Sequence, residues 1–240
     1  MAGLQVRKFR VASRRMTSSC DISIALEPSD GEPMFAFKPG QFVMVHLFEP
    51  DGSVWAKTAY SISTAPIESK DRFEIGVRLA GDFTKRMHAL KEGDTVGIQG
   101  PFGVFTLRDG ATRSVFFAGG IGITPIRGMI REALLSTRNQ ELFLIYCNRS
   151  KDMIAYEDDF RVLASSHPNF HPIFVIERDL PDAWDGERGR ISADIIKKHL
   201  PSLDDTDYYV CGPPPFMDAV RGILEAEGVD VKARMSKETF

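Results

Sequence analysis

The spacing of the apolar residues changes near residue 110, and this change limits the folds that the chain can adopt. Before it, short segments of alternating apolar and polar residues are separated by turn-forming Gly, Pro and Asp. After it, apolar segments of strand length alternate with segments of helix length. We therefore expect two structural units, residues 1–109 and residues 113–240, joined near residues 109–113.

The first unit reads as a series of short strands. The candidate strands are residues 4–11, 21–26, 41–48, 58–63, 72–79 and 95–99, with one short helix at 84–90. Repeated short strands with turns between them are typical of a small antiparallel barrel or sandwich.

The second unit reads as alternating strands and helices. The expected strands are residues 114–118, 142–147, 173–176, 208–211 and 231–235, and the expected helices are 125–136, 154–164, 192–200 and 214–227. Mostly apolar strands that alternate with helices indicate a parallel sheet covered on both faces. We expect a doubly wound α/β fold with five parallel strands.

Composition excludes several classes of protein. The chain has 240 residues, 43% of them hydrophobic, and 30 basic against 33 acidic residues give a net charge of −3. This balance argues against a nucleic acid as the main partner. No apolar run reaches the ~18 residues of a membrane span, and residues 1–15 lack the apolar core of a signal peptide. A cytoplasmic location is expected.

The cysteines and histidines give no metal-binding pattern. Cys20, Cys147 and Cys211 lie far apart, so a zinc ribbon or a four-cysteine iron–sulfur cluster is excluded. An unclustered odd count fits a reducing compartment. His167 and His171 have a spacing that chelates a metal from one helix face, but the prolines that follow each of them indicate a loop. We expect no metal site.

A glycine-rich turn follows the first strand of the second unit. It contains Gly119, Gly120, Gly122, Thr124 and Pro125. Such glycines let backbone N–H groups approach a phosphate, and the start of the next helix adds partial positive charge. Thr124 is expected to cap that helix, with Pro125 at its first position. The spacing is not G-x-G-x-x-G, and the alternative is a tight turn without a ligand.

A second motif, residues 209–217, follows the fourth strand. Ligands of open α/β sheets bind outside the carboxyl ends of the strands, so Cys211 and Gly212 are expected to face the same crevice as the glycine turn. The alternative is a buried cysteine before a helix that starts with prolines.

A third motif lies in the first unit, where residues 57–63 contain Tyr60 and Ser61. A tyrosine beside a hydroxyl suits a flat ring with polar edges, and the turn at residues 81–84 suits a phosphate. On pattern alone, an ordinary strand is the favoured interpretation.

The ordered set of motifs resembles the ferredoxin–NADP reductase superfamily. The matching segments are Tyr60-Ser61, residues 100–103, residues 119–125 and residues 211–217, and together they span nearly the whole chain. Within the superfamily, the chain is most similar to cytochrome b5 reductase and to bacterial oxygenase reductases, also through residues 177–185. The resemblance implies an antiparallel barrel that binds FAD and an α/β domain that binds NAD(P)H.

The resemblance also implies roles for individual residues. The flavin-binding residues would be Tyr60, Ser61, Ile62, Ser63, Gly81, Phe83, Thr84 and Phe240. The residues around the nicotinamide dinucleotide would be Gly119, Gly120, Gly122, Thr124, Pro125, Glu177, Arg178, Gly212, Pro213 and Met217. Ser61, Cys211 and Glu238 would serve catalysis: Ser61 would hydrogen-bond near flavin N5, Cys211 would border the nicotinamide, and Glu238 would support Ser61.

Two positions bear on the choice of cofactors. The family usually has Arg where this chain has Thr58, and an Arg there pairs with the flavin phosphate, so FMN in place of FAD stays open. Lys57, Arg78 and Lys85 are candidates to compensate. A carboxylate at Glu177 accepts from the ribose 2′-OH and repels a 2′-phosphate, which favours NADH, although Arg149 and Arg178 could bind a phosphate.

The implied function is reduction of bound FAD by NADH, followed by electron transfer to a separate acceptor. Candidate acceptors are a ferredoxin, rubredoxin, flavodoxin, cytochrome or oxygenase component, or a small molecule. Two alternatives remain: a non-catalytic flavin-binding subunit of a larger redox complex, and a dinucleotide-binding domain joined to an unrelated barrel. We expect a monomer or homodimer.

Overall fold

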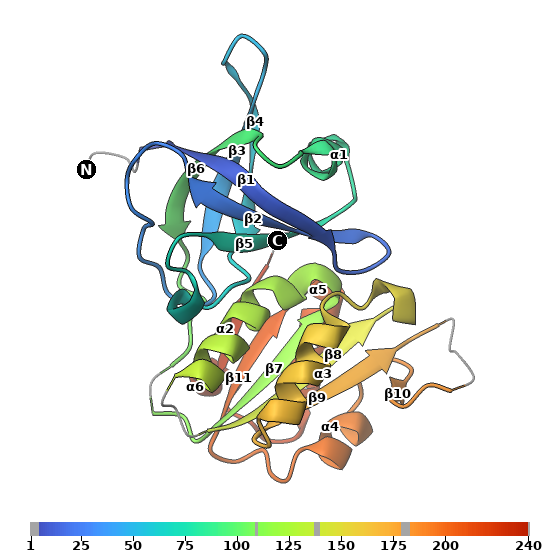
Figure 1. Cartoon of the computed structure of the whole chain (residues 1–240). Coiled ribbons are helices and arrows are strands. Elements are labelled where there is room, and N and C mark those ends of the chain that lie inside the picture. Colours follow the sequence, from blue (N-terminus) through green and yellow to red (C-terminus); the bar gives the residue numbers. More distant parts are fainter. Residues whose placement is uncertain (1–4, 109, 137–139, 179–182, 240) are drawn as a thin grey trace.

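The first half of the chain forms six antiparallel strands in a computed structural model that describes residues 5–108, 110–136, 140–178 and 183–239 (Figure 1). The strand order is β4-β3-β6-β1-β2-β5. The bounds are β1 Arg7–Met16, β2 Asp21–Pro28, β3 Phe42–Phe48, β4 Val54–Ser61, β5 Phe73–Arg78 and β6 Thr95–Phe102. A bridge between Ile62 and Ile75 joins the two outer strands, so the sheet closes into the expected barrel.

The barrel encloses its own hydrophobic core. Val43, Val45 and Leu47 alternate along β3 and pack inside with residues of the other strands. Two short helices follow the strands that meet at the bridge: a 3-10 helix η1, Pro66–Glu68, after β4, and α1, Asp82–Ala89, after β5. Strand β4 begins earlier and ends earlier than the predicted 58–63, because its pairing with β3 runs from Val54 opposite Phe48 to Ser61 opposite Phe42.

The second half forms a parallel sheet in the order β10-β9-β8-β7-β11-β12. Its strands are β7 Arg113–Gly119, β8 Glu141–Asn148, β9 Phe170–Ile176, β10 Glu187–Arg188, β11 Thr206–Cys211 and β12 Met235–Glu238. Its helices are α2 Ile123–Leu135, α3 Glu157–Ser166, α4 Ala193–His199, α5 Pro214–Ala226 and α6 Val231–Arg234, with short 3-10 turns η2 Gly120–Gly122 and η3 Lys151–Met153.

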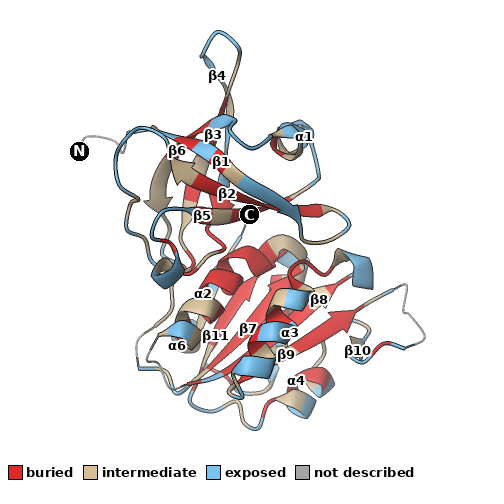
Figure 2. Ribbon diagram, in the orientation of Figure 1, coloured by how far each residue is buried: buried red, intermediate tan, exposed pale blue. Residues whose placement is uncertain are grey.

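Helices cover both faces of this sheet, as expected. Helices α2 and α3 pack on one face, and α4 and α5 pack on the other. The strands between them are almost entirely buried, as the red ribbon in Figure 2 shows, whereas the hairpin between β3 and β4 is exposed at its tip. The C-terminal ends of β7 and β11 point toward the barrel, and η1 lies beside α2 (Figure 1).

The strand count differs from the expected five because of β10. This two-residue strand pairs with Val175 and Ile176 at the outer edge of β9. The last strand was also predicted wrongly at 231–235. Residues 231–234 form α6 instead, because the Asp230 carboxylate accepts hydrogen bonds from the N–H groups of Lys232 and Ala233 and caps the helix. The strand therefore starts at Met235.

Three further local predictions need correction. Helix α2 begins at Ile123 with Gly122 as its N-cap, so Thr124 is not the cap and Pro125 is not its first residue. Helix α3 begins at Glu157, after η3. His171 lies in β9 rather than in a loop, because Pro172 is tolerated where β10 does not reach the edge of β9.

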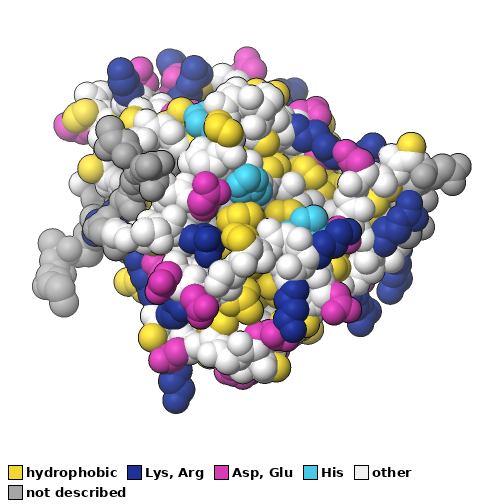
Figure 3. Space-filling view, turned by 90° about the horizontal axis from the view of Figure 1, so that it is seen from below, with side chains coloured by type: hydrophobic (Ala, Val, Ile, Leu, Met, Phe, Trp, Pro, Cys, Tyr) yellow, Lys and Arg dark blue, Asp and Glu magenta, His cyan; other side chains and the backbone are white. Residues whose placement is uncertain are grey.

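The face away from the barrel carries mixed side chains. Seen from below, acidic and basic side chains are interspersed with hydrophobic ones, and the described residues visible there form no broad area of one sign (Figure 3). No helix within the described ranges is long and apolar enough to cross a membrane.

Candidate active site

Tyr60 and Ser61 end strand β4, and the hydroxyl group of each is buried. Tyr60 is 9% exposed and Ser61 is 3% exposed. Neither hydroxyl has a hydrogen-bond partner among the described residues. Burial raises the pKa of the Tyr60 hydroxyl. A buried hydroxyl without a partner is costly, so this pair suits a ligand with polar edges.

Tyr60 also belongs to a row of stacked rings. Its ring centroid lies 6.1 Å from that of Phe83, with 27° between the planes. Trp55 stacks on Phe83 at 5.9 Å, and the guanidinium carbon of Arg86 lies 3.8 Å from the centre of the Trp55 ring. The row forms an aromatic surface between β4 and the start of α1.

The start of α1 contains the predicted phosphate-binding turn. The Thr84 hydroxyl accepts from the N–H groups of Ala80 and Gly81 at 2.8 and 2.9 Å. The turn is therefore held by its own side chain. Asp82, the first residue of the helix, is paired with Lys85 at 3.1 Å. A carboxylate at a helix start competes with a phosphate for the same positive end of the helix.

Thr58 is exposed on β4. Two of the basic residues that could replace the missing positive charge, Lys85 and Arg78, lie in different places. Lys85 is paired with Asp82. Arg78 holds the fully buried Asp21 with two hydrogen bonds of 2.8 Å and lies against Gly120 in the second half of the chain. Arg78 therefore belongs to the neighbouring cleft rather than to the start of α1.

The side chains of Ile62 and Ser63 make contacts within the barrel, and flavin binding by these two residues stays a prediction. Ile62 packs in the barrel core, and the Ser63 hydroxyl donates to the carbonyl of Glu74 at 3.1 Å. Phe240 lies outside the described residues.

Glu238 reaches the junction of the two halves from β12. Its Oε2 atom is buried without a partner among the described residues, and burial raises the pKa of this carboxyl to about 7. A Cβ on Gly103 would lie 3.7 Å from Oε1 of Glu238 and 3.0 Å from the Phe42 ring, and Phe42 pairs with Ser61 in the sheet. These contacts bring Glu238 and Ser61 to the same junction.

Cys211 is fully buried at the end of β11. Burial, and secondarily the charge of Glu238, raise the pKa of its thiol. A raised pKa favours the neutral thiol over the thiolate.

Two glycine-containing turns meet beside this junction. Gly120 has a φ of +55°, which disfavours other residues, and a Cβ there would lie 2.6 Å from Arg78 Nη1. A Cβ on Gly122 would lie 2.3 Å from the carbonyl oxygen of Cys211. The turn after β7 thus packs backbone to backbone against the turn after β11.

A cleft of about 640 Å³ opens next to these turns. Of the predicted residues, Gly119, Gly120, Glu177, Arg178 and Pro213 line it. The cleft is also lined by Arg149, which was a candidate to bind a phosphate of the nucleotide, by Arg78, which was expected at the flavin phosphate, and by Arg190, which was not predicted. Arg149 had a signal, because it follows the carboxyl end of β8. No sequence signal indicated that Arg78, which comes from the barrel, would line this cleft.

Four arginines and one carboxylate give the cleft its charge. Glu177 is paired with Arg190 at 3.4 Å. Arg78, Arg149 and Arg178 add further positive charge to the lining. The cleft is thus suited to a ligand that carries several negative charges and a hydroxyl group that can donate a hydrogen bond to Glu177.

Other predicted residues support the cleft without lining it. Thr124 is buried, and its hydroxyl donates to the carbonyl of Ile121 at 3.1 Å. Pro125 is buried in α2. Gly212 touches Gly119. Met217 packs in the hydrophobic core behind the sheet and does not line the cleft, so its contact with the dinucleotide stays a prediction.

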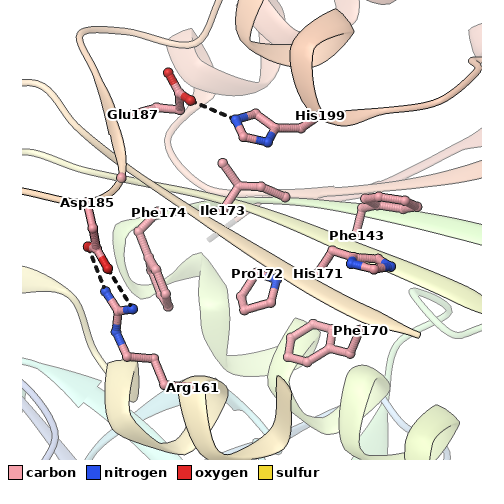
Figure 4. A pocket seen from close by; sticks show the side chains of 11 residues that line it. Phe143, Arg161, Phe170, His171, Pro172, Ile173, Phe174, Asp185, Glu187 and His199 are labelled. Carbon is pink, nitrogen blue, oxygen red and sulfur yellow. Dashed lines mark hydrogen bonds and ion pairs between the residues drawn. The ribbon is translucent and has the colours of Figure 1, made fainter. Parts of the chain in front are cut away.

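A smaller cavity of about 420 Å³ lies at the outer edge of β9 (Figure 4). Its charged side chains are paired with one another: Arg161 with Asp185 at 3.1 Å, and His199 with Glu187 at 2.7 Å. None of the predicted site residues lines it. No group of three or more metal-binding side chains occurs in the described part of the chain. We therefore place the candidate site at the junction and the larger cleft.

Two family models together match most of the chain. Residues 9–107 match the oxidoreductase FAD-binding domain, and residues 116–222 match the oxidoreductase NAD-binding domain. The chain is 30% identical over 241 residues to the flavohemoprotein of Deinococcus radiodurans, covering 98% of this chain and 59% of that protein. It is 33% identical over 217 residues to the glycine betaine monooxygenase reductase subunit of Pseudomonas aeruginosa, covering 88% and 58%.

Solved structures show the same fold. The flavohem-like FAD/NAD-binding domain of nitric oxide dioxygenase from Vibrio cholerae superimposes with a TM-score of 0.88 at 24% identity, covering 98% of both chains. The cytochrome b5 reductase domain of Ulva prolifera nitrate reductase superimposes with a TM-score of 0.85 at 22% identity, covering 98% of this chain and 97% of that one. The chain is a member of the ferredoxin–NADP reductase superfamily, an oxidoreductase with an FAD-binding domain followed by an NAD-binding domain.

Proposed function

We propose that the chain oxidises NADH, holds the acquired electrons on FAD bound at the junction, and delivers them to a separate redox acceptor. The observation that carries this proposal is that three polar atoms at the ends of β4 and β12 are buried without a partner among the described residues: Tyr60 Oη, Ser61 Oγ and Glu238 Oε2. The arginine-lined cleft for a dinucleotide opens beside them. The boundary between a flavin unit, 1–109, and a nucleotide unit, 113–240, stays a prediction.

Ser61 and Tyr60 would bind the flavin, and Glu238 would hold or release a proton. When bound, FAD supplies a centre that accepts a hydride from NADH and can release the two electrons one at a time. Ser61 would donate a hydrogen bond to the ring edge, and Tyr60 would pack on the ring. Glu238, with a pKa of about 7, would hold or release a proton near neutral pH at its buried Oε2 atom.

The cleft would hold NADH through charge and close backbone approach. Arg78 and Arg149 would pair with the pyrophosphate, and the N–H groups of the glycine turn would face it. Glu177 would accept from the ribose 2′-OH, which favours NADH over NADPH.

FMN is the alternative flavin, and a specific observation favours it. Thr58 offers no charge to a pyrophosphate, and Asp82 places a carboxylate at the start of α1. We propose FAD because residues 9–107 match an FAD-binding domain.

The acceptor is proposed only as a class. A separate ferredoxin, rubredoxin, flavodoxin, cytochrome or oxygenase component, or a small molecule, would receive the electrons. The relatives named above extend well beyond the matched region, which is 59% of one and 58% of the other.

Flavin content tests the proposal directly. The purified chain is incubated with FAD or FMN and freed of excess ligand, and the flavin that remains is released and identified by chromatography. The proposal expects close to one FAD per chain. Absence of both flavins would contradict it and would favour the subunit or dinucleotide-only alternatives.

A further inference from the structure

Helix α2 lies directly on the backbone of the segment that follows the proposed flavin strand. A Cβ on Gly128 would be 2.9 Å from the carbonyl oxygen of Thr64 and 3.1 Å from that of Ile62. No larger residue fits there without separating the helix from this segment. Ile62 and Thr64 come one and three residues after Ser61.

Arg127, the neighbour of Gly128, holds the same segment by hydrogen bonds. It is 4% exposed. Its Nη1 donates to the carbonyl of Ser63 at 2.9 Å and to the Glu74 carboxylate at 3.2 Å, and its Nη2 donates to Asp159 at 2.8 Å. One side chain therefore joins α2 to two barrel segments and to α3.

The partners of Arg127 form a compensated charge cluster. Arg15 of β1 also donates to Asp159, at 2.7 Å, and the Ser23 hydroxyl donates to Glu74 at 3.0 Å. Burial alone would raise the pKa of Asp159, but the charges of Arg127 and Arg15 hold it below its usual value. Each carboxylate keeps another hydrogen-bond donor when Arg127 is replaced, so neither is left without a partner.

Arg127 thus connects the two parts of the candidate site, which are the flavin-binding strand and the glycine turn. Ser63 lies two residues after Ser61, and Arg127 lies in the first turns of the helix that the glycine turn begins. Thr124 of the same helix lies against Gly76 of β5, where a Cβ would be 2.4 Å from the threonine methyl group. Any change in the angle of α2 would therefore move the glycine turn relative to Ser61.

We propose that Arg127 is a positioning residue that fixes the nicotinamide-binding turn at the correct distance from the flavin-binding strand. The inference rests on the proposed function. Hydride transfer depends steeply on the distance and alignment of donor and acceptor, so a displacement of about 1 Å can cost about 100-fold in rate. Neutral replacement should therefore slow transfer while leaving the cleft able to bind NADH.

The test compares Arg127→Met with Arg131→Met. Arg131 lies one turn further along α2 and also crosses the junction, to Glu68 of η1, but away from the flavin strand. Anaerobic stopped-flow absorbance gives the limiting rate of flavin reduction and the Kd for NADH. We expect R127M to lower the rate about ten-fold or more, with the Kd within about two-fold, and R131M to change neither.

A conservative and a steric variant separate positioning from general stability. Arg127→Lys keeps the charge but loses the forked geometry, so its rate should lie between those of the wild type and R127M. Gly128→Ala keeps every ion pair but forces α2 off the carbonyl of Thr64, and it should slow reduction as R127M does. Gly222→Ala in α5 is the matched control, because a Cβ there meets nothing within 4 Å.

Hydrogen exchange gives a readout that needs no flavin. In the chain without cofactors, R127M and G128A should speed amide exchange in residues 62–64 and in the first turns of α2, and R131M should not. Wild-type reduction rates and unchanged exchange in both variants would overturn the inference. A wild-type chain that binds no flavin would contradict the proposed function instead, and the exchange experiment would still decide the role of Arg127.

Discussion

Glu238 stands directly opposite Cys211, because β12 pairs in parallel with β11. This register brings a carboxyl group to the carboxyl end of the sheet, where the barrel covers it. The same pairing places the Glu238 carboxyl close enough to Cys211 to add to the effect of burial on the pKa of the thiol. Burial raises the pKa of Glu238 to about 7, and burial together with the Glu238 charge raises that of Cys211.

Glu238→Gln should change how stability depends on pH. The pKa of Glu238 is raised from 4.5 to about 7, so between these values the native chain binds a proton that the unfolded chain has lost. The free energy of unfolding of the wild type therefore contains a component that falls as pH rises from about 5 to about 7. Glutamine lacks it, so urea unfolding should show E238Q gaining stability relative to the wild type at pH 8 compared with pH 5.

The exposed carboxylate Glu225 on α5 provides the control for this experiment. E225Q should show the same difference from the wild type at both pH values. A difference between E238Q and the wild type that does not vary with pH would show that the Glu238 carboxyl titrates normally.

Ser61→Ala should slow flavin reduction without weakening NADH binding. The Ser61 hydroxyl is buried and without a partner among the described residues, so a hydrogen bond to bound flavin is its proposed use. Removing one preorganised donor should lower the limiting rate roughly ten- to hundred-fold in stopped-flow measurements. Ser53→Ala, in the exposed β3–β4 hairpin, is the control. Equal losses in rate and NADH affinity would mean that Ser61 has a structural role.

Glu177→Ser should shift the nucleotide preference toward NADPH. Glu177 lines the cleft, and its replacement removes a charge that repels a 2′-phosphate and frees Arg190 from its ion pair. The ratio of kcat/KM for NADPH to that for NADH should rise about ten-fold or more. Glu141→Ser is the control and should leave the ratio unchanged, because Glu141 begins β8 at the end of the strand away from the cleft. The same ratio in E177S and the wild type would rule out Glu177 as the selecting residue.

Thr58→Arg should tighten flavin binding. The exposed Thr58 offers no charge to a flavin phosphate. A charge-assisted hydrogen bond there is worth about 1.5–3 kcal/mol, so fluorescence titration should give a Kd for FAD lower by about one to two decades. Thr58→Gln adds length without charge and should have little effect. An equal gain from both variants would point to packing rather than charge.

Local patterns predicted most of the fold because strands, helices and turns have local signatures. The alternation along β5 and the glycines from Gly119 to Gly122 need no distant partner to be interpreted. The error at residues 231–235 shows the limit of such patterns. Apolar residues there suggested a strand, but the Asp230 side chain caps a helix turn first and delays the strand to Met235.

Tertiary partners set the parts of the site that local patterns missed. Arg127 sits in a mostly apolar helix, and nothing near it in sequence indicates Ser63, Glu74 or Asp159 as its partners. Arg78 ends a barrel strand, yet it lines the nucleotide cleft because the barrel packs on the glycine turn. Both positions depend on how the two halves meet.

The most direct test of the proposed reductase activity is the visible spectrum of the FAD-loaded chain during anaerobic addition of NADH and, separately, of NADPH. The proposal predicts that flavin absorbance disappears with about one equivalent of NADH, and faster than with NADPH. A bound flavin that keeps its oxidised spectrum in excess NADH would contradict it.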